Sequence, residues 1–238
     1  MKQVFRVFWG CTLAAALALT GCGRGGAPGS SGAGSMSGSG SGAMSGGTAG
    51  QEQARRTGLG VVTEAAGSDR AGKITTAAAA VVLDADGKLA DVMLDELELS
   101  VSGGSTGSVT IPEDVRSKRT KGEDYPLAAA SSLGKGWAEQ ADWFADYLTG
   151  RTPDEVKKLK TDENGKPQDA DLVSGCTIAV DRYRDAVVRA CEQAKALGAA
   201  QGDRVTLSLI AADLPQNLAA TDDQDAHVRA DITLAALT

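Results

Sequence analysis

Apolar residues in the first half of the globular sequence form short runs in which β-branched residues are frequent, a pattern typical of strands. The runs occupy Leu59–Thr63, Ile74–Leu83, Leu89–Ser100 and Val109–Ile111. Between the second and third runs, Asp84–Lys88 is a turn in which Gly87 suits a positive φ, so these runs predict a β-hairpin. The turn resembles the start of a calcium loop, but a Glu at the twelfth position and flanking helices are missing, so we exclude that site.

The middle of the chain changes to a helical period, after the charged, turn-rich segment 117–126. Apolar residues recur every three or four positions over Ser131–Leu148. Thr152 followed by Pro153 predicts the N-cap and first turn of a helix that runs to about Lys160. A further helix, ending near Gly198, is predicted from an apolar face formed by Val180, Tyr183, Val187, Cys191 and Ala194.

The last two apolar runs of the chain resemble the first two runs of its globular part. Val205–Ala212 is similar to Thr57–Glu64, and Ala230–Leu237 is similar to Ile74–Leu83. We interpret residues 205–238 as a half-repeat whose two strands complete the same sheet. The expected fold class is therefore α+β: an antiparallel sheet of N- and C-terminal strands, with helices from the middle of the chain packed on it.

The N-terminus has the pattern of a bacterial lipoprotein leader. Lys2 and Arg6 precede an apolar run from Val7 to Leu19, which is too short to span a membrane. The sequence Leu19-Thr-Gly-Cys22 resembles a lipobox, in which cleavage before the Cys is followed by acylation of its thiol. We expect residues 1–21 to be the signal peptide and Cys22 the lipidated anchor, although a plain secretion signal ending near a Cys is an alternative.

Residues 22–56 follow as a tether, because the stretch from 23 to 50 is almost entirely Gly, Ser and Ala. A coil of that length has an end-to-end distance of roughly 30 Å. We expect it to hold the globular residues 57–238, one domain, away from the membrane on the extracytoplasmic face. This arrangement suits a mobile carrier and a surface-displayed binding protein equally well.

The net charge of the chain argues against a nucleic-acid partner. The 238 residues contain 24 basic and 31 acidic residues, for a net charge of −7. Removal of residues 1–21, which hold two basic and no acidic residues, leaves 22 basic against 31 acidic residues and a net charge of −9. Because no basic tract lies in the globular part and the pI is near 4.8, we expect no nucleic-acid partner.

Two of the four cysteines remain in the expected globular domain, Cys176 and Cys191. One precedes the last predicted helix and the other lies inside it. A disulfide needs Cα atoms about 6 Å apart, whereas this spacing spans several helical turns. We therefore expect two buried free thiols.

The stretch Asp171-Leu-Val-Ser-Gly-Cys-Thr177 is a polar turn that leads into the best amphipathic helix of the chain. It resembles the flavin-attachment motif of the FMN-binding domain family, Asp-x-x-Ser/Thr-Gly-Ala-Thr. Further stretches resemble exported lipoproteins of that family: Thr57-Gly-Leu-Gly-Val-Val-Thr63, Lys121-Gly-Glu-Asp-Tyr125, Trp137–Phe144 and Gly150-Arg-Thr-Pro-Asp-Glu-Val156.

The resemblance implies FMN, attached covalently through a phosphoester to Thr177, with Ser174, Gly175, Cys176 and Asp171 as the other residues of the site. Gly175 would let the backbone approach the phosphate, and N–H groups at the start of the following helix would bind it. Trp137, Trp143 or Tyr125 would stack on the flavin ring. The implied partners are a flavin transferase and redox proteins, and the implied role is electron transfer rather than catalysis.

Two departures leave a second interpretation open. Cys176 replaces the Ala of the family, and Ile178-Ala-Val180 lacks the Ser or Thr that often follows the acceptor. In this interpretation Ser174–Thr177 is an N-terminal capping turn of the next helix, and the chain is a cofactor-free surface lipoprotein with a binding or structural role. Trp137 and Phe144 would then be core residues.

The chain offers no constellation for hydrolytic or metal chemistry. Its single His, His227, lies in a polar stretch without a nucleophile pattern or metal-ligand spacing nearby. We expect no metal site, and we interpret Asp222, Asp223 and Asp225 as a solvated loop.

Overall fold

The computed structural model describes residues 8–10, 13–17, 54–68, 71–104, 108–218 and 227–237. Cys22, the tether to residue 53 and Asp222, Asp223 and Asp225 lie outside these ranges. The strands are β1 (Phe8–Gly10), β2 (Leu13–Leu17), β3 (Arg56–Ser68), β4 (Ala71–Leu83), β5 (Leu89–Gly103), β6 (Val109–Thr110), β7 (Thr206–Leu218) and β8 (His227–Leu237). The helices are α1 (Lys118–Lys121), the 3₁₀ turn η1 (Gly122–Asp124), α2 (Trp137–Leu148), α3 (Pro153–Lys157), α4 (Ala170–Val173) and α5 (Asp181–Gln193).

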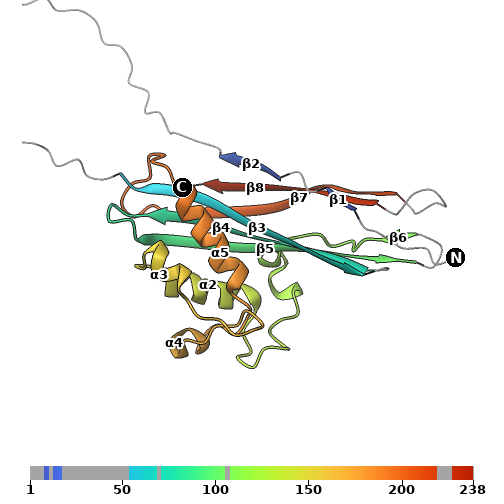
Figure 1. Ribbon diagram of the computed structural model, residues 1–238, viewed down its shortest axis with the longest axis horizontal. Helices are drawn as coiled ribbons and strands as arrows, with labels where there is room; N and C mark the ends of the chain where they lie inside the picture. The colour runs from blue at the N-terminus through green and yellow to red at the C-terminus, as the bar shows by residue number, and fades with distance from the viewer. Residues whose placement is uncertain are drawn as a thin grey trace, which may run out of the picture.

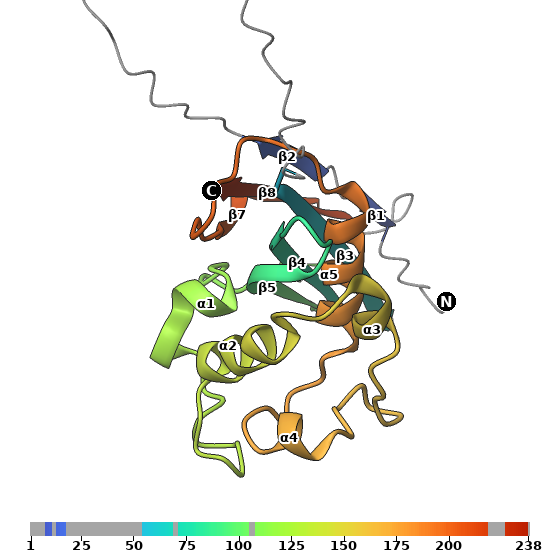
Figure 2. The ribbon, with the colours of Figure 1, turned by 90° about the vertical axis from the view of Figure 1, so that its left-hand side faces the viewer.

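The central layer is an antiparallel sheet in the order β3-β4-β5-β6. The helices from the middle of the chain lie on one face of this sheet, and the β7–β8 hairpin lies on the other (Figure 1). Figure 2 shows the layers end-on, with the helices and the C-terminal hairpin on opposite sides of β4 and β5. The α+β class, with antiparallel strands from both ends of the chain, is confirmed.

The placement of the C-terminal strands differs from the expectation of one continuous sheet. β7 and β8 pair with each other in a second sheet, and β8 also pairs in parallel with β1 and β2 on its other edge. The reason lies in β4, where every residue from Ala77 to Leu83 is almost fully buried. A strand that is apolar at both odd and even positions needs cover on both faces, and the C-terminal hairpin supplies the second cover.

The strand pairing can be compared with the half-repeat once an alignment is chosen. If Val205 is aligned with Thr57 and Ala230 with Ile74, Leu209 matches Val61 and Leu234 matches Ala78, and the structure pairs Val61 with Ala78 and Leu209 with Leu234. The same correspondence holds along the hairpin from Gly58↔Val81 and Thr206↔Leu237 to Glu64↔Thr75 and Ala212↔Asp231. The two hairpins therefore share one register over seven successive pairs.

The helices differ from the sequence-based predictions in their ends and by one short helix. α3 ends at Lys157 rather than near Lys160. α2 begins at Trp137 rather than near Ser131, because Gly134 adopts a φ of 64° and Gly136 is the N-cap. α5 ends at Gln193 rather than near Gly198, because Lys195 exchanges two backbone hydrogen bonds with Thr57 at the edge of β3. The turn-rich segment 117–126 contains α1, whose first turn Ser117 caps by accepting a hydrogen bond from the Thr120 N–H.

The alanines of β4 are divided between two hydrophobic cores. Ala77 and Ala79 face the helices, whereas Ala78 and Ala80 face the β7–β8 hairpin. α5 approaches the neighbouring strand β3 so closely that a Cβ on Gly60 would lie 2.0 Å from the Ala186 carbonyl oxygen, and one on Gly58 would lie 1.9 Å from that of Ala190. Small residues are thus a condition for the contact between α5 and the sheet.

We predict that Gly60→Ala lowers the free energy of unfolding by about 1–3 kcal/mol, because the added methyl pushes α5 off β3. Gly67→Ala is the matched control: it lies at the exposed end of the same strand, where an added Cβ would be 3.3 Å from its nearest neighbour. Urea unfolding of both variants checks this. Equal losses would contradict the close contact between helix and strand.

Candidate functional site

The flavin-attachment-like motif forms α4 and the loop that follows it. The carboxylate of Asp169 accepts hydrogen bonds from the backbone N–H groups of Asp171 and Leu172, so it caps α4. Leu172 anchors the short helix in the core with 1% of its surface exposed. Gly175 N–H and Cys176 N–H both donate to the Leu172 carbonyl, at 3.2 and 2.9 Å, which closes the turn.

Thr177 is held by a buried amide. Its backbone N–H and its hydroxyl both donate to Oε1 of Gln140, at 2.9 and 3.1 Å. On the other side, Nε2 of Gln140 donates to Oγ of Ser131 and to the Lys135 carbonyl, both at 3.0 Å. Gln140 is fully buried, and its four hydrogen bonds join the loop that precedes α2 to the motif loop. Thr177 itself is half-buried.

Gly175 lies against the indole of Trp143. A Cβ at Gly175 would be 2.1 Å from Cδ2 of this ring, so only glycine permits the contact. Trp143 is 41% exposed, and the Lys135 ammonium lies 4.7 Å from the centre of an indole ring. An exposed aromatic ring therefore covers the glycine two residues before Thr177.

The other aromatic candidates lie elsewhere. Trp137 is buried, makes an edge-on contact with Tyr183 at a centroid distance of 5.9 Å and donates from Nε1 to the Tyr183 hydroxyl at 3.1 Å. The Lys118 ammonium covers the Tyr125 ring at 4.8 Å. Of the three aromatic residues named from sequence, Trp143 contacts the motif, and Trp137 is a core residue.

The remaining motif residues divide into exposed and buried ones. Asp171 and Ser174 are exposed, and the Ser174 hydroxyl donates to the Asp171 carbonyl at 2.7 Å. Cys176 is fully buried, and burial raises the pKa of its thiol to about 11. Burial likewise raises the pKa of Cys191 to about 12, and both thiols are free, as predicted.

The capping interpretation of Ser174–Thr177 is wrong. α5 begins at Asp181 with Val180 as its N-cap, no side chain caps this end, and the Thr177 hydroxyl is bonded to Gln140 instead. The N–H group of Arg182 in the first turn of α5 is taken by the Asp181 carboxylate at 2.9 Å. The start of α5 thus carries an acidic group where the resemblance implies a phosphate-binding end.

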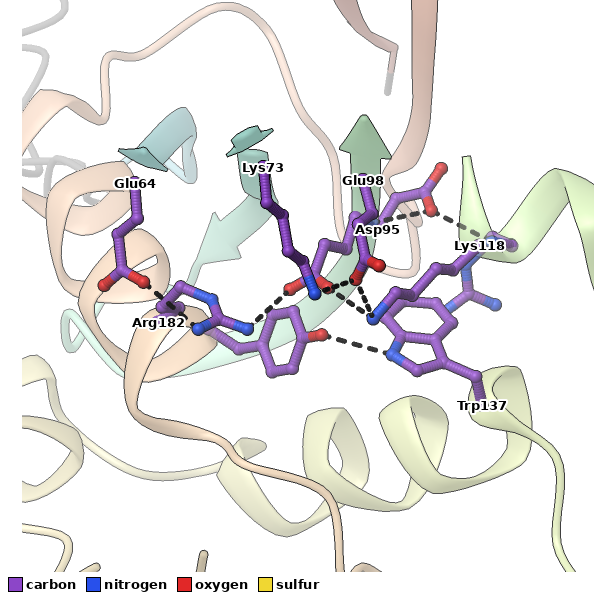
Figure 3. Close-up of polar contacts among 10 residues, drawn as sticks. Glu64, Lys73, Asp95, Glu98, Lys118, Trp137 and Arg182 are labelled. Atoms are coloured by element: carbon purple, nitrogen blue, oxygen red, sulfur yellow. Dashed lines mark hydrogen bonds and ion pairs between the residues drawn. The ribbon is translucent and has the colours of Figure 1, made fainter. Parts of the chain in front are cut away.

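A second polar cluster, which sequence reasoning missed, lies on β5 beneath α1 and α5. Glu96 is fully buried; Oε1 pairs with the ammonium of Lys118, and Oε2 lies 3.5 Å from Nη2 of Arg182. Glu98 pairs with Lys73 at 2.9 Å and Lys118 at 3.6 Å, and Glu64 pairs with Arg182 at 3.1 Å (Figure 3).

The cluster balances its own charge, with three acidic side chains (Glu64, Glu96, Glu98) and three basic ones (Lys73, Lys118, Arg182). Burial alone would lower the pKa of Lys118, but the charge and hydrogen bond of Glu96, together with those of Tyr125, outweigh burial and raise the pKa. Burial and the same charge raise the pKa of Tyr183 well above its ordinary value. These contacts fasten α1 and α5 to the sheet, which is a structural role.

One member of this cluster, Glu96, can be identified from the sequence. Glu96 follows Val92 and Leu94 at the two-residue period of β5, on the face that the helices cover. An acidic residue in phase with a buried face requires a basic partner, so Glu96 could have been identified as part of a buried ion pair. Nothing in the local sequence identifies Lys118 as that partner.

Comparisons with protein-family models, with curated proteins and with solved structures found no match to this chain. Among the residues that the structure describes, no helix is long and apolar enough to cross a membrane. The described residues also contain no group of three or more His, Cys, Asp or Glu side chains that could hold a metal ion. His227 lies at the start of β8.

We predict that Gln140→Leu lowers the free energy of unfolding by about 2–4 kcal/mol, because it leaves the buried partners of the amide unpaired. The matched control, Asp146→Ala, replaces an exposed residue of the same helix and should change stability by less than about 0.5 kcal/mol. Denaturant unfolding, with amide hydrogen exchange at Thr177, checks both effects. Unchanged protection of the Thr177 N–H in Gln140→Leu would refute the role of the amide.

We predict that Lys118→Met costs about 3–5 kcal/mol of stability, because it leaves the buried carboxylate of Glu96 without its closest cation. The double variant Glu96→Leu/Lys118→Met removes both charges and should recover most of that loss. Chemical unfolding of wild type, both single variants and the double variant forms a complete cycle. Additive losses would show that the two side chains act independently.

Proposed function

We propose that the chain is an extracytoplasmic lipoprotein, anchored to the cell membrane by acylated Cys22, which carries FMN covalently on Thr177 for electron transfer. The observation that carries the proposal is the setting of Thr177: a half-buried hydroxyl on a glycine turn, beside an exposed indole. The leader, the tether and the order of the resembling stretches support the same proposal. Membrane, flavin transferase and redox proteins are its partners.

The residues of the loop fit a phosphoester at Thr177. The hydroxyl has one hydrogen bond, to Gln140, and the Thr177 N–H would keep its own bond to the same oxygen if the hydroxyl were esterified. Cys176 is no obstacle, because it lies in the core where the family has Ala. The indole of Trp143 is partly exposed beside the acceptor turn, and the ammonium of Lys135 over this ring adds a positive charge that suits an anionic group.

FMN would supply one- or two-electron chemistry. The residues of the chain would have a positioning role: Gln140 fixes the acceptor loop, Gly175 and Trp143 shape its surface, and Leu172 anchors it. The tether of residues 22–56 would let the domain move between a membrane donor and an outer acceptor.

The second candidate is a cofactor-free surface lipoprotein with a binding or structural role. The observation that favours it is Asp181, whose carboxylate takes an N–H group at the start of α5 and adds negative charge near the place proposed for the phosphate. The two candidates share the anchor and the fold, and they differ in one covalent bond.

We expect the chain, co-expressed with a bacterial flavin transferase, to gain the mass of one FMN less one water, since a phosphoester forms with loss of water. Thr177→Ala should abolish the gain. Ser174→Ala removes the exposed hydroxyl of the same motif and is the matched control, which should keep the gain. Intact-mass measurement after proteolytic release of residues 51–238 distinguishes the three chains.

Absence of the mass gain in wild type, beside a known acceptor protein flavinylated by the same transferase, would overturn covalent attachment. A gain that persists in Thr177→Ala would move the site elsewhere. The first result leaves the cofactor-free lipoprotein as the better account, whereas the second keeps a covalently bound FMN and rejects Thr177 as its acceptor.

A further inference from the structure

The second sheet offers an edge that other polypeptide can occupy. β8 pairs with β7 on one side, and its other side is paired in parallel with Phe8–Gly10 and Leu13–Leu17. Leu13 lies opposite Ile232, and Leu17 lies opposite Ala236. Both occupying segments belong to the part of the chain that the proposed function removes as a leader. The inference below rests on that removal.

The first hairpin indicates what this edge is suited to bind. β3–β4 and β7–β8 share one pairing register, so the free side of β8 corresponds to the side of β4 that pairs with β5. β5 runs antiparallel to β4 over Ala71–Leu83. An open strand edge presents N–H and C=O groups to a strand of either direction, and β1 and β2 occupy this one in parallel. By the correspondence with β4 and β5, an antiparallel strand also fits this edge once residues 1–21 are gone.

The occupant that the observations favour is a second copy of the same strand. The stretch that lies on the edge in this structure, Leu13-Ala-Ala-Ala-Leu17, has the small apolar composition that β8 itself repeats in Leu234-Ala-Ala-Leu237. An antiparallel pairing of two β8 strands centred on Leu234 would set Ile232 of one copy opposite Ala236 of the other. No charged residue lies between 232 and 237, so this pairing brings no like charges together.

We propose that the processed protein forms a two-fold symmetric dimer through antiparallel pairing of its β8 strands, which joins the two β7–β8 hairpins into one continuous sheet. A two-fold interface uses the same surface on both subunits, and a strand edge meets that condition with its own backbone groups. Anchorage of every copy to one membrane raises the local concentration and favours the pairing.

The outer-face residues of β8 provide the test. Thr233 and Ala235 are half-buried and alternate with the inward-facing Ile232, Leu234 and Ala236. The proposed pairing sets residue 233 of one copy opposite residue 235 of the other, so in membranes of cells that make the full chain we expect the double variant Thr233→Cys/Ala235→Cys to give a disulfide-linked dimer for more than half of the processed chains. Non-reducing electrophoresis after copper-catalysed oxidation measures the dimer, because cross-strand residues lie close enough for disulfide formation.

Two controls separate this edge from other contacts. Ser208→Cys and Ile210→Cys place exposed thiols on β7, opposite Ala235 and Thr233, and should give little dimer. Cys22→Ala, which cannot be processed as a lipoprotein, keeps residues 8–17 and should lose the cross-link of the β8 double variant. Wild-type Cys176 and Cys191 are buried and should contribute no background.

A processed Thr233→Cys/Ala235→Cys variant that unfolds at the wild-type temperature but stays monomeric would overturn the proposal, as would dimers formed equally through β7. A cross-linked product of a mass other than two chains would assign the edge to a different partner and reject the second copy. If intact mass shows that wild type keeps residues 1–21, the proposed anchor fails separately. A chain produced from residue 22, with Cys22→Ala, then decides the dimer by the same cross-links.

Discussion

The fold depends on one close contact, between α5 and the β3–β4 hairpin. Gly58 and Gly60 let the carbonyl groups of α5 approach the backbone of β3, and Ala186 and Ala190 are fully buried. Because the helix lies so near the sheet, Tyr183 reaches Trp137 and Arg182 reaches Glu96. The motif loop immediately precedes this helix, so its position also follows from the contact.

Two buried polar arrangements then fix the helices in one place. Gln140 satisfies both ends of its amide within the helical layer, and Glu96 joins β5 to α1 and α5 through Lys118 and Arg182. Apolar packing alone would tolerate small shifts of short helices such as α1. Directional hydrogen bonds and ion pairs do not, since a displaced partner leaves a buried polar group unsatisfied.

Much of the sheet could be predicted from sequence, because alternation and turn residues act locally. The hairpin around Gly87 is an example in the sheet. The capped start of α3 at Thr152 is an example among the helices. The start of α2 was missed because the apolar period continues through Gly134, where the backbone turns instead. The separate C-terminal sheet was not predicted, although one sequence feature indicates it. The unbroken apolar run Ala77–Leu83 requires that other elements pack on both faces of β4.

The candidate site was predictable in composition but not in contacts. The motif residues Asp171 to Thr177 are contiguous, and their turn follows from Gly175 and the short helix before it. Gln140 lies 37 residues before Thr177, and no local pattern connects the two. Trp143 was one of three aromatic candidates, and only the fold selects it, through its contact with Gly175.

The shared register of the two hairpins has a consequence for how the chain folds. β3 and β7 are built to similar patterns, so each presents a partner surface that could accept the return strand of the other hairpin. Residues 69 and 70 separate β3 from β4, whereas more than a hundred residues separate β3 from β8. The entropy of closing the longer loop disfavours the exchanged pairing by roughly 4 kcal/mol. Chain connectivity, rather than side-chain complementarity, therefore keeps the two units from mispairing as they form.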